Sequence, residues 1–104
     1  MSSLNSIDEI NAAVSNNKNV MVVIRFGDID DPLCVLYDEM LDRLKNKVRK
    51  FVKIFRCEKE NIPEIQENMK SPASLLVFYN CKLIKEIEYD IEDEELLEIL
   101  QKIP

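Results

Sequence analysis

The sequence predicts an α/β fold, a four-stranded mixed β-sheet flanked by helices on both faces. Three observations lead to this prediction. Short apolar runs alternate with longer stretches of helical periodicity, the runs are rich in β-branched residues, and helix-capping residues stand at several boundaries between them. The chain of 104 residues has the length of one domain, and 46% of its residues are hydrophobic, so we expect a single domain over residues 1–104.

The first helix and the first strand are predicted from a capping pattern and an apolar run. Ser6 and Glu9 fit a capping box in which Ser6 is the N-cap and Glu9 reaches back to it, and the helix continues to about Val14. Residues 20–26 are apolar apart from Arg25. Such a run is too short for a globular helix and is typical of a strand that is covered on both faces.

A long helix is expected to follow the loop at residues 27–30. Asp31 can accept backbone N–H bonds as an N-cap, and Pro32 fits the first helical position because its missing N–H is not needed there. The buried stripe of this helix is predicted to contain Leu33, Leu36, Met40, Leu44 and Val48.

The second half of the chain is predicted to hold three strands and two helices. The strands are expected at 51–57, 74–79 and 82–88, and a short helix at 61–69 has Pro63 in its first turn. Asn80 and Cys81 form the tight turn of a hairpin between the last two strands.

The last helix is expected to begin at Asp90 as its cap, with the carboxylates of residues 92–95 at its positive end. Its buried stripe is predicted to contain Leu96, Leu97, Leu100 and Ile103. The order of elements implies parallel strands joined by helical crossovers and completed by an antiparallel hairpin. This is the thioredoxin-like arrangement.

The composition excludes several kinds of site. The chain has no histidine, so imidazole catalysis and Cys/His metal sites are excluded, and the spacing of its three cysteines matches no zinc pattern. We expect no cofactor and no metal, and reduced thiols in a reducing compartment. Because the chain has no apolar run near about 20 residues and no signal-peptide pattern, we expect no membrane association and a place in the cytosol or nucleus.

The charge distribution leaves one question open. The formal net charge of −6 opposes general affinity for nucleic acid. Seven of the fourteen basic residues lie in residues 43–56, which fits a solvated helix face, a docking surface for an acidic protein or a contact with RNA. Phe51 and Phe55 are expected in the core, so this stretch lacks exposed aromatic residues, and no sequence-specific binding of nucleic acid is expected.

The position where this fold carries redox chemistry lacks the attacking thiol. A thioredoxin-type enzyme places Cys-x-x-Cys where the loop after the first strand enters the long helix, and its first cysteine attacks the substrate disulfide. The same window here runs from Asp31 to Cys34, so a carboxylate stands in place of that cysteine. Cys34 is predicted to lie one turn into the helix and to face inward, where thiols are usually inert.

The residues around this window resemble a known family. Four segments, 22–27, 31–34, 38–41 and 72–80, are similar to the DIM family of thioredoxin-like splicing proteins, the mitosis-protein family. The resemblance covers roughly residues 7–88. It implies a non-enzymatic pre-mRNA splicing factor in the nucleus, which binds other spliceosomal proteins within the U5 snRNP and the tri-snRNP particle.

This chain also departs from the family pattern that it resembles. The family usually has a cysteine at position 73, opposite Cys34, and a tryptophan just before Asp31, whereas this chain has Ala73 and Asp30. A disulfide between positions 34 and 73 is therefore impossible. Family members continue beyond the last helix with an asparagine-rich loop and a basic tail, and the sequence ends at Pro104, so we expect a divergent, C-terminally shortened member.

The partner-binding surface is predicted around the loop that leads into the long helix. Its expected residues are Arg25, Asp28, Asp30, Asp31, Pro32 and Cys34. Arg25 is also expected to be ion-paired with Asp28, Asp30 or Asp38, because a charge in a buried strand needs a partner. Two alternatives are kept: a thiol oxidoreductase or redox sensor that uses Cys34 alone, and a thioredoxin-like chaperone cofactor unrelated to RNA.

Overall fold

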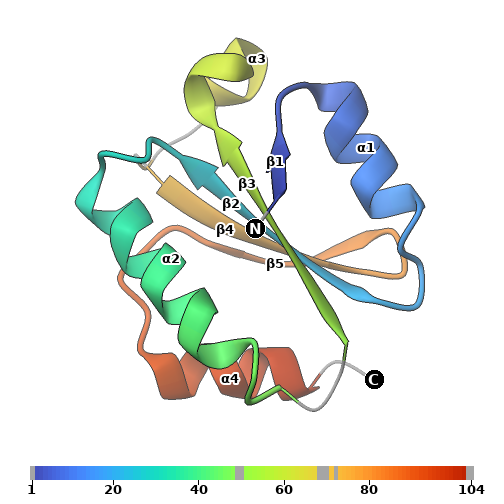
Figure 1. Cartoon of the computed structure of the whole chain (residues 1–104), viewed down its shortest axis with the longest axis vertical. Helices are drawn as coiled ribbons and strands as arrows, with labels where there is room; N and C mark the ends of the chain where they lie inside the picture. Colours follow the sequence, from blue (N-terminus) through green and yellow to red (C-terminus); the bar gives the residue numbers. More distant parts are fainter. Residues whose placement is uncertain (1, 49–50, 68–70, 72, 103–104) are drawn as a thin grey trace.

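The computed structural model describes residues 2–48, 51–67, 71 and 73–102 (Figure 1). Its elements in chain order are β1 (Ser2–Leu4), α1 (Ile7–Ser15), β2 (Met21–Gly27), α2 (Pro32–Leu44), β3 (Val52–Glu58), the short 3-10 helix η1 (Lys59–Asn61), α3 (Pro63–Gln66), β4 (Ala73–Tyr79), β5 (Lys82–Ile87) and α4 (Asp93–Lys102).

The strands form one mixed sheet in the order β1-β3-β2-β4-β5. β1, β3 and β2 run parallel, β4 is antiparallel to β2, and β5 is antiparallel to β4. The predicted mixed sheet is confirmed, but the expected number of four strands was wrong because β1 adds a fifth. β1 has only three residues, two of them serines, so no apolar pattern marked it in the sequence.

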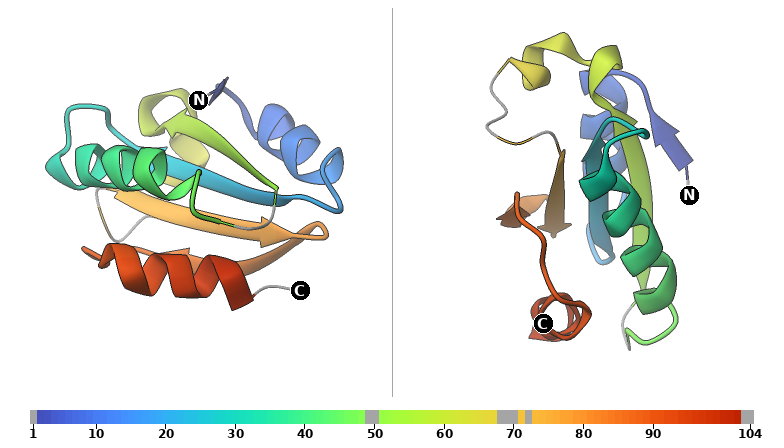
Figure 2. Two further views of the ribbon diagram at one scale, coloured as in Figure 1. Left: turned by 60° about the horizontal axis from the view of Figure 1, so that its bottom comes forward. Right: turned by 90° about the vertical axis from the view of Figure 1, so that its left-hand side faces the viewer.

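Helices lie on both faces of the sheet (Figures 1 and 2), and an apolar layer lies on each side of it. One layer lies between the sheet and the pair α2 and α4, and includes Val23, Leu41, Leu75 and Leu96. The other layer lies between the opposite face and α1 with the segment around α3, and includes Ile24 and Ile62. All seven residues of β2 are buried, which confirms that this strand is covered on both faces.

Two of the predicted helix caps are present in the structure. The Ser6 hydroxyl accepts a hydrogen bond from the Glu9 backbone N–H at 3.1 Å, and the Asp31 carboxylate accepts one from the Leu33 N–H at 2.9 Å. The predicted reciprocal bond of this capping box was wrong by one residue. The Glu9 carboxylate accepts from the backbone N–H of Asn5 rather than from that of Ser6.

The buried face of α2 differs from the predicted stripe. Leu36 is 42% exposed and the helix ends at Leu44, before Val48, whereas Cys34 and Tyr37 are fully buried. The Tyr37 hydroxyl donates to the backbone carbonyl of Tyr89 at 2.6 Å and lies 3.5 Å from that of Ile87. The buried face of α2 thus includes a phenol whose hydroxyl has carbonyl acceptors, which hydrophobicity alone did not indicate.

Several expectations for the second half are also corrected. Phe51 was expected in the core but is 73% exposed, because it precedes β3 and lies outside both apolar layers. α4 begins at Asp93 rather than directly after Asp90. Its predicted stripe is confirmed at Leu96 and Leu100, while Leu97 is partly buried and Ile103 lies outside the described residues.

The predicted helix at 61–69 is shorter in the structure. η1 and α3 together run from Lys59 to Gln66, with Pro63 as the first residue of α3, and residues 68 and 69 lie outside the described residues. The predicted hairpin turn is confirmed, since Asn80 and Cys81 have φ values of 53° and 67° between β4 and β5. In the described part of the chain, none of the helices is long and apolar enough to span a membrane.

Candidate functional site

The loop from β2 to α2 is held in shape by its own backbone and by its aspartates. Gly27 ends β2 at a φ of 153°, a conformation that residues with a Cβ atom avoid. The Asp28 carboxylate accepts from the Asp30 N–H at 3.1 Å, and its carbonyl accepts from the Asp31 N–H at 2.9 Å. The loop is therefore a compact turn that delivers Asp31 to the start of α2 as its N-cap.

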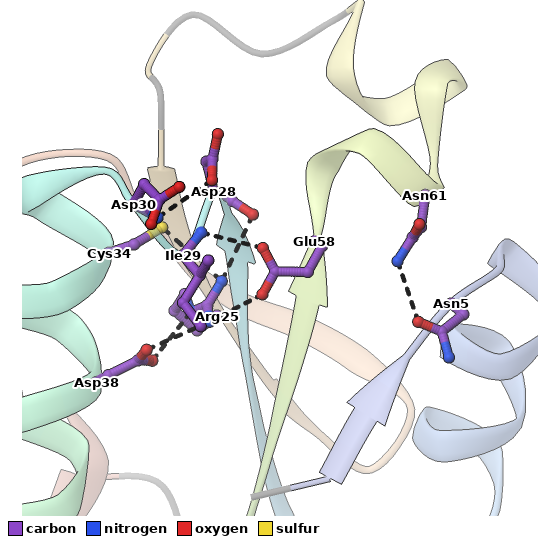
Figure 3. Close-up of polar contacts among 10 residues, drawn as sticks. Asn5, Arg25, Asp28, Ile29, Asp30, Cys34, Asp38, Glu58 and Asn61 are labelled. Atoms are coloured by element: carbon purple, nitrogen blue, oxygen red, sulfur yellow. Dashed lines mark hydrogen bonds and ion pairs between the residues drawn. The ribbon is translucent and has the colours of Figure 1, made fainter.

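Arg25 lies below this loop and connects three elements (Figure 3). Its side chain is fully buried between β2 and α2. The guanidinium contacts the Asp38 carboxylate of α2 through two bonds, Nε to Oδ1 at 2.9 Å and Nη2 to Oδ2 at 3.2 Å. Nη2 also lies 3.4 Å from Oε1 of Glu58 at the end of β3, and the other oxygen of Glu58 accepts from the Ile29 N–H at 3.0 Å. Glu58 thereby links Arg25 to the loop.

The remaining N–H groups of Arg25 also have acceptors. Nη1 lies 3.5 Å from the carbonyl oxygen of Gly27 and 3.8 Å from Sγ of Cys34. A guanidinium has five N–H donors, and the five contacts of Arg25 account for all of them. Burial lowers the pKa of Arg25, but the hydrogen bonds and the charge of Asp38 outweigh this effect. The pKa of Arg25 therefore lies above its ordinary value. Arg25 is thus a permanent internal cation that positions the loop.

The structure decides between the ion-pair partners that the sequence left open. Asp38 is the principal partner of Arg25, whereas the Asp28 carboxylate accepts from the backbone N–H of Asp30. Glu58 was missed, because only the register that places it beside Gly27 brings it to the loop. A hollow lined by Asp28, Glu58, Lys59 and Glu60 has a volume of about 10 Å³, room for about one water rather than a ligand.

Cys34 lies directly under the loop but is not an activated thiol. Its side chain is fully buried, and burial raises its pKa to about 11, although the neighbouring Arg25 lowers it in part. At neutral pH the group is a thiol and not the nucleophilic thiolate. The inward orientation predicted for Cys34 is confirmed.

The other two cysteines lie away from Cys34. Cys57 is buried in the apolar layer on the opposite face of the sheet, and Cys81 is exposed at the hairpin turn. All three are free thiols. Among the described residues there is also no group of three or more histidine, cysteine, aspartate or glutamate side chains that could hold a metal ion.

The outer side of the loop and of the first turns of α2 presents apolar groups between carboxylates. Ile29 is 51% exposed, and Val35 and Leu36 are each 42% exposed. Pro32 is also exposed, and the same loop and helix start carry exposed or half-buried carboxylates: Asp28, Asp30, Asp31 and Glu39. We call these eight residues the loop surface. The sequence predicted the three aspartates and Pro32 as contact residues. It missed four others: Leu36 was expected in the buried stripe, Ile29 lies in the predicted loop, and Val35 and Glu39 were not assigned to the surface.

The architecture matches solved thioredoxins. The chain superposes on a thioredoxin from Plasmodium falciparum with a TM-score of 0.78 over all of both chains, at 16% identity. It superposes on mitochondrial thioredoxin 3 from Saccharomyces cerevisiae with a TM-score of 0.80 at 16% identity, covering 99% of this chain and 95% of that one. At these identities the likeness shows the fold, and it confirms the predicted thioredoxin-like class.

Sequence comparisons identify the family. The family model for mitosis protein DIM1 matches residues 1–102. The chain is 33% identical to spliceosomal protein DIB1 of Candida glabrata over 75 residues, which is 70% of this chain and 53% of that protein. It is 26% identical to spliceosomal protein DIB1 of Saccharomyces cerevisiae over 106 residues, with 90% of this chain and 74% of that protein covered. The chain thus spans between about half and three quarters of the length of these relatives. It belongs to the mitosis protein DIM1 family.

Proposed function

We propose that this chain is a pre-mRNA splicing factor of the nucleus that acts as a protein-binding subunit of the U5 snRNP and tri-snRNP, without catalysis of its own. The relatives named spliceosomal proteins support the splicing role. The observation that carries the non-enzymatic part is the window from Asp31 to Cys34. There a capping carboxylate replaces the attacking thiol, and the remaining thiol is buried with a pKa of about 11.

The loop surface is proposed as the contact for another spliceosomal protein. Its exposed apolar side chains, Ile29, Val35 and Leu36, lie on a loop and a helix start whose positions are set by the Arg25 network. A rigid apolar centre with a polar rim is the composition of a protein-binding surface. Within this proposal Asp28, Asp30, Asp31 and Pro32 contact the partner, whereas Arg25 and Cys34 act from below by positioning the loop.

The redox alternative rests on one observation, the Nη1 group of Arg25 at 3.8 Å from Sγ of Cys34. A guanidinium favours a thiolate, but burial outweighs it and the pKa remains raised. Reduction of insulin with dithiothreitol tests this alternative. We expect no acceleration over the uncatalysed rate, with or without Cys34→Ser. An acceleration that disappears in Cys34→Ser would replace the binding proposal by an enzymatic one.

The test of the binding proposal is affinity capture of the tagged chain from its own cells, with the bound proteins and RNAs identified. We expect spliceosomal proteins and their small nuclear RNAs with the unaltered chain, and their loss with Ile29→Asp combined with Asp30→Lys. Asp8→Lys, an exposed carboxylate of α1, is the matched control and should keep the partners. Capture of redox or chaperone partners alone would contradict the splicing role, and retention by the double variant would contradict the proposed surface.

A further inference from the structure

A groove of about 470 Å³ lies at the opposite end of the sheet from the loop surface. The register of β2 with β4 places Gly27 beside Ala73 and Val22 beside Phe78, so the hairpin turn after β4 lies at the start of β2 and the loop surface at its end. Residues of the hairpin and of the last turns of α4 line the groove: Tyr79, Lys82, Ile84, Lys85, Ile99 and Lys102. Figure 2 shows α4 running beneath this hairpin.

One wall of the groove is an unpaired sheet edge. β5 is the last strand in the order β1-β3-β2-β4-β5, so one side of its backbone has no neighbouring strand within the described sheet. Residues 82–86 are all exposed, and Leu83 and Ile84 are 50% and 46% exposed. An edge of this kind offers N–H and C=O groups to an extended segment, which can join the sheet as an additional strand.

The charge of the groove opposes the charge of the whole chain. Three of its lining residues are lysines, and its described lining contains no carboxylate, although the net charge of the chain is −6. Lys102 is paired with Glu98 at 2.8 Å, but both side chains are largely exposed, and such a pair is easily exchanged for another partner. The groove therefore favours an acidic ligand with an apolar side chain that fits between Tyr79, Ile84 and Ile99.

Lysines on an edge strand often serve only to prevent pairing with other chains. That role would require neither an apolar groove beneath the edge nor the exposed Leu83 and Ile84. A second copy of this chain complements the edge less well than an acidic segment does. In an antiparallel pair of β5 strands, one register places Lys82 opposite Lys85 of the other copy and joins like charges, whereas the register that places Lys82 opposite Glu86 sets Lys85 opposite Leu83.

We propose that the outer edge of β5 and this groove form a second docking site, which binds an extended acidic segment of another protein as an added strand. The segment places an apolar side chain in the groove and its carboxylates near Lys82, Lys85 and Lys102. The site uses no residue of the loop surface, so it stands independently of the proposed splicing function. With docking sites at both ends of the sheet, the chain can hold two proteins together.

The test is an NMR titration of the full chain, labelled with ¹⁵N, with a synthetic peptide of about seven residues. The peptide has a valine–isoleucine–valine centre flanked by aspartates and glutamates. We expect shifts of the backbone amide signals of β5 and α4 on titration, and none at residues 28–36. Lys82→Glu combined with Lys85→Glu should weaken binding by at least about tenfold, and replacing the peptide carboxylates by amides should do the same.

The matched control is Lys18→Glu combined with Lys53→Glu, two exposed lysines outside the groove, which should leave the affinity within about twofold. Circular dichroism confirms that each variant is folded. The proposal is overturned if the peptide does not bind at about 1 mM, or if the shifts appear at the loop surface. It is also overturned if the groove double variant and the control double variant bind the peptide with equal affinity. Self-association through β5 without peptide binding, seen by sedimentation, would also overturn it and assign the edge to a second copy.

Discussion

Two arginine–aspartate pairs in this protein have similar geometry and opposite surroundings. Arg25 and Asp38 meet through contacts of 2.9 and 3.2 Å, and Arg43 and Asp93 meet through contacts of 2.8 and 3.0 Å. The Arg25 side chain is fully buried and that of Asp38 is 23% exposed, whereas those of Arg43 and Asp93 are 50% and 37% exposed. Water can replace the partner of Arg43, but it cannot reach Arg25. We therefore expect burial, and not bond length, to decide what an ion pair contributes to the stability of the fold.

The largest effect is expected from Asp38→Ala, which leaves a buried guanidinium without its main partner. We expect a loss of about 3–5 kcal/mol in the free energy of unfolding, measured by urea denaturation. This is a large share of the about 5–15 kcal/mol that stabilises a typical domain. Asp42→Ala, on the same helix with a side chain that is 74% exposed, is the control and should change little. Similar losses in both variants would remove the basis of the comparison.

A second substitution separates the loss of the Asp38 contact from the cost of a buried charge that has lost its main partner. If the cost of Asp38→Ala comes from the guanidinium, which then keeps only Glu58 as an ion-pair partner, Arg25→Met in the same chain should restore part of the stability, because it removes that charge. Urea denaturation of the two single variants and the double variant measures this coupling. Additive losses would show that the charge itself is not the cause.

The next effect concerns the buried thiol beside Arg25. Burial raises the pKa of Cys34 from about 9 to about 11, so the folded chain holds the proton more tightly than the unfolded chain. The contribution of this thiol to the free energy of unfolding is therefore fully present below pH 9. It is lost as the pH rises towards 11, by up to about 1.4 kcal/mol per pH unit. Urea denaturation across this window should show a shallower decline in Cys34→Ala, while Cys81→Ala, at an exposed thiol, should follow the unaltered chain. Equal slopes in all three chains would contradict the assignment.

An intermediate effect is expected at Asp31, whose half-buried carboxylate caps α2. Asp31→Ala should lower the stability by about 1 kcal/mol, which corresponds to a decrease of roughly 4–8 °C in the melting temperature of a domain this small. Asp31→Asn keeps an acceptor for the Leu33 N–H and should melt close to the unaltered chain. If Asp31→Asn melts normally but loses its partners in affinity capture, the carboxylate contacts a partner as well as the helix.

The smallest effect is expected from Arg43→Ala at the exposed pair. Arg43 lowers the pKa of Asp93 through their hydrogen bonds, but both groups are in contact with water. We expect a change in the denaturation midpoint that is close to experimental error and that disappears in about 1 M salt. A loss as large as that of Asp38→Ala, or one that persists in high salt, would show that geometry outweighs burial.

The local pattern predicted much of the fold and only part of the candidate site. The run that includes Val22 and Ile24 identified β2, and Asp31 with Pro32 identified the start of α2, because these signals depend on neighbouring residues alone. The same reasoning failed for Leu36 and Phe51, which are apolar but exposed. Hydrophobicity indicates that a residue can be buried, but the rotation of a helix and the end of a strand depend on what packs against them.

The sequence alone determined the fold class, the family and the loss of the attacking thiol, since each depends on which residues occupy consecutive positions. Only the tertiary structure decided which carboxylates surround Arg25. Asp38 and Glu58 are separated from it by 13 and 33 residues, and strand register and helix packing bring them together. It also decided that Cys34 is desolvated and that three lysines from β5 and α4 line one groove. These properties arise from distances between segments that are remote in the chain, which local periodicity does not encode.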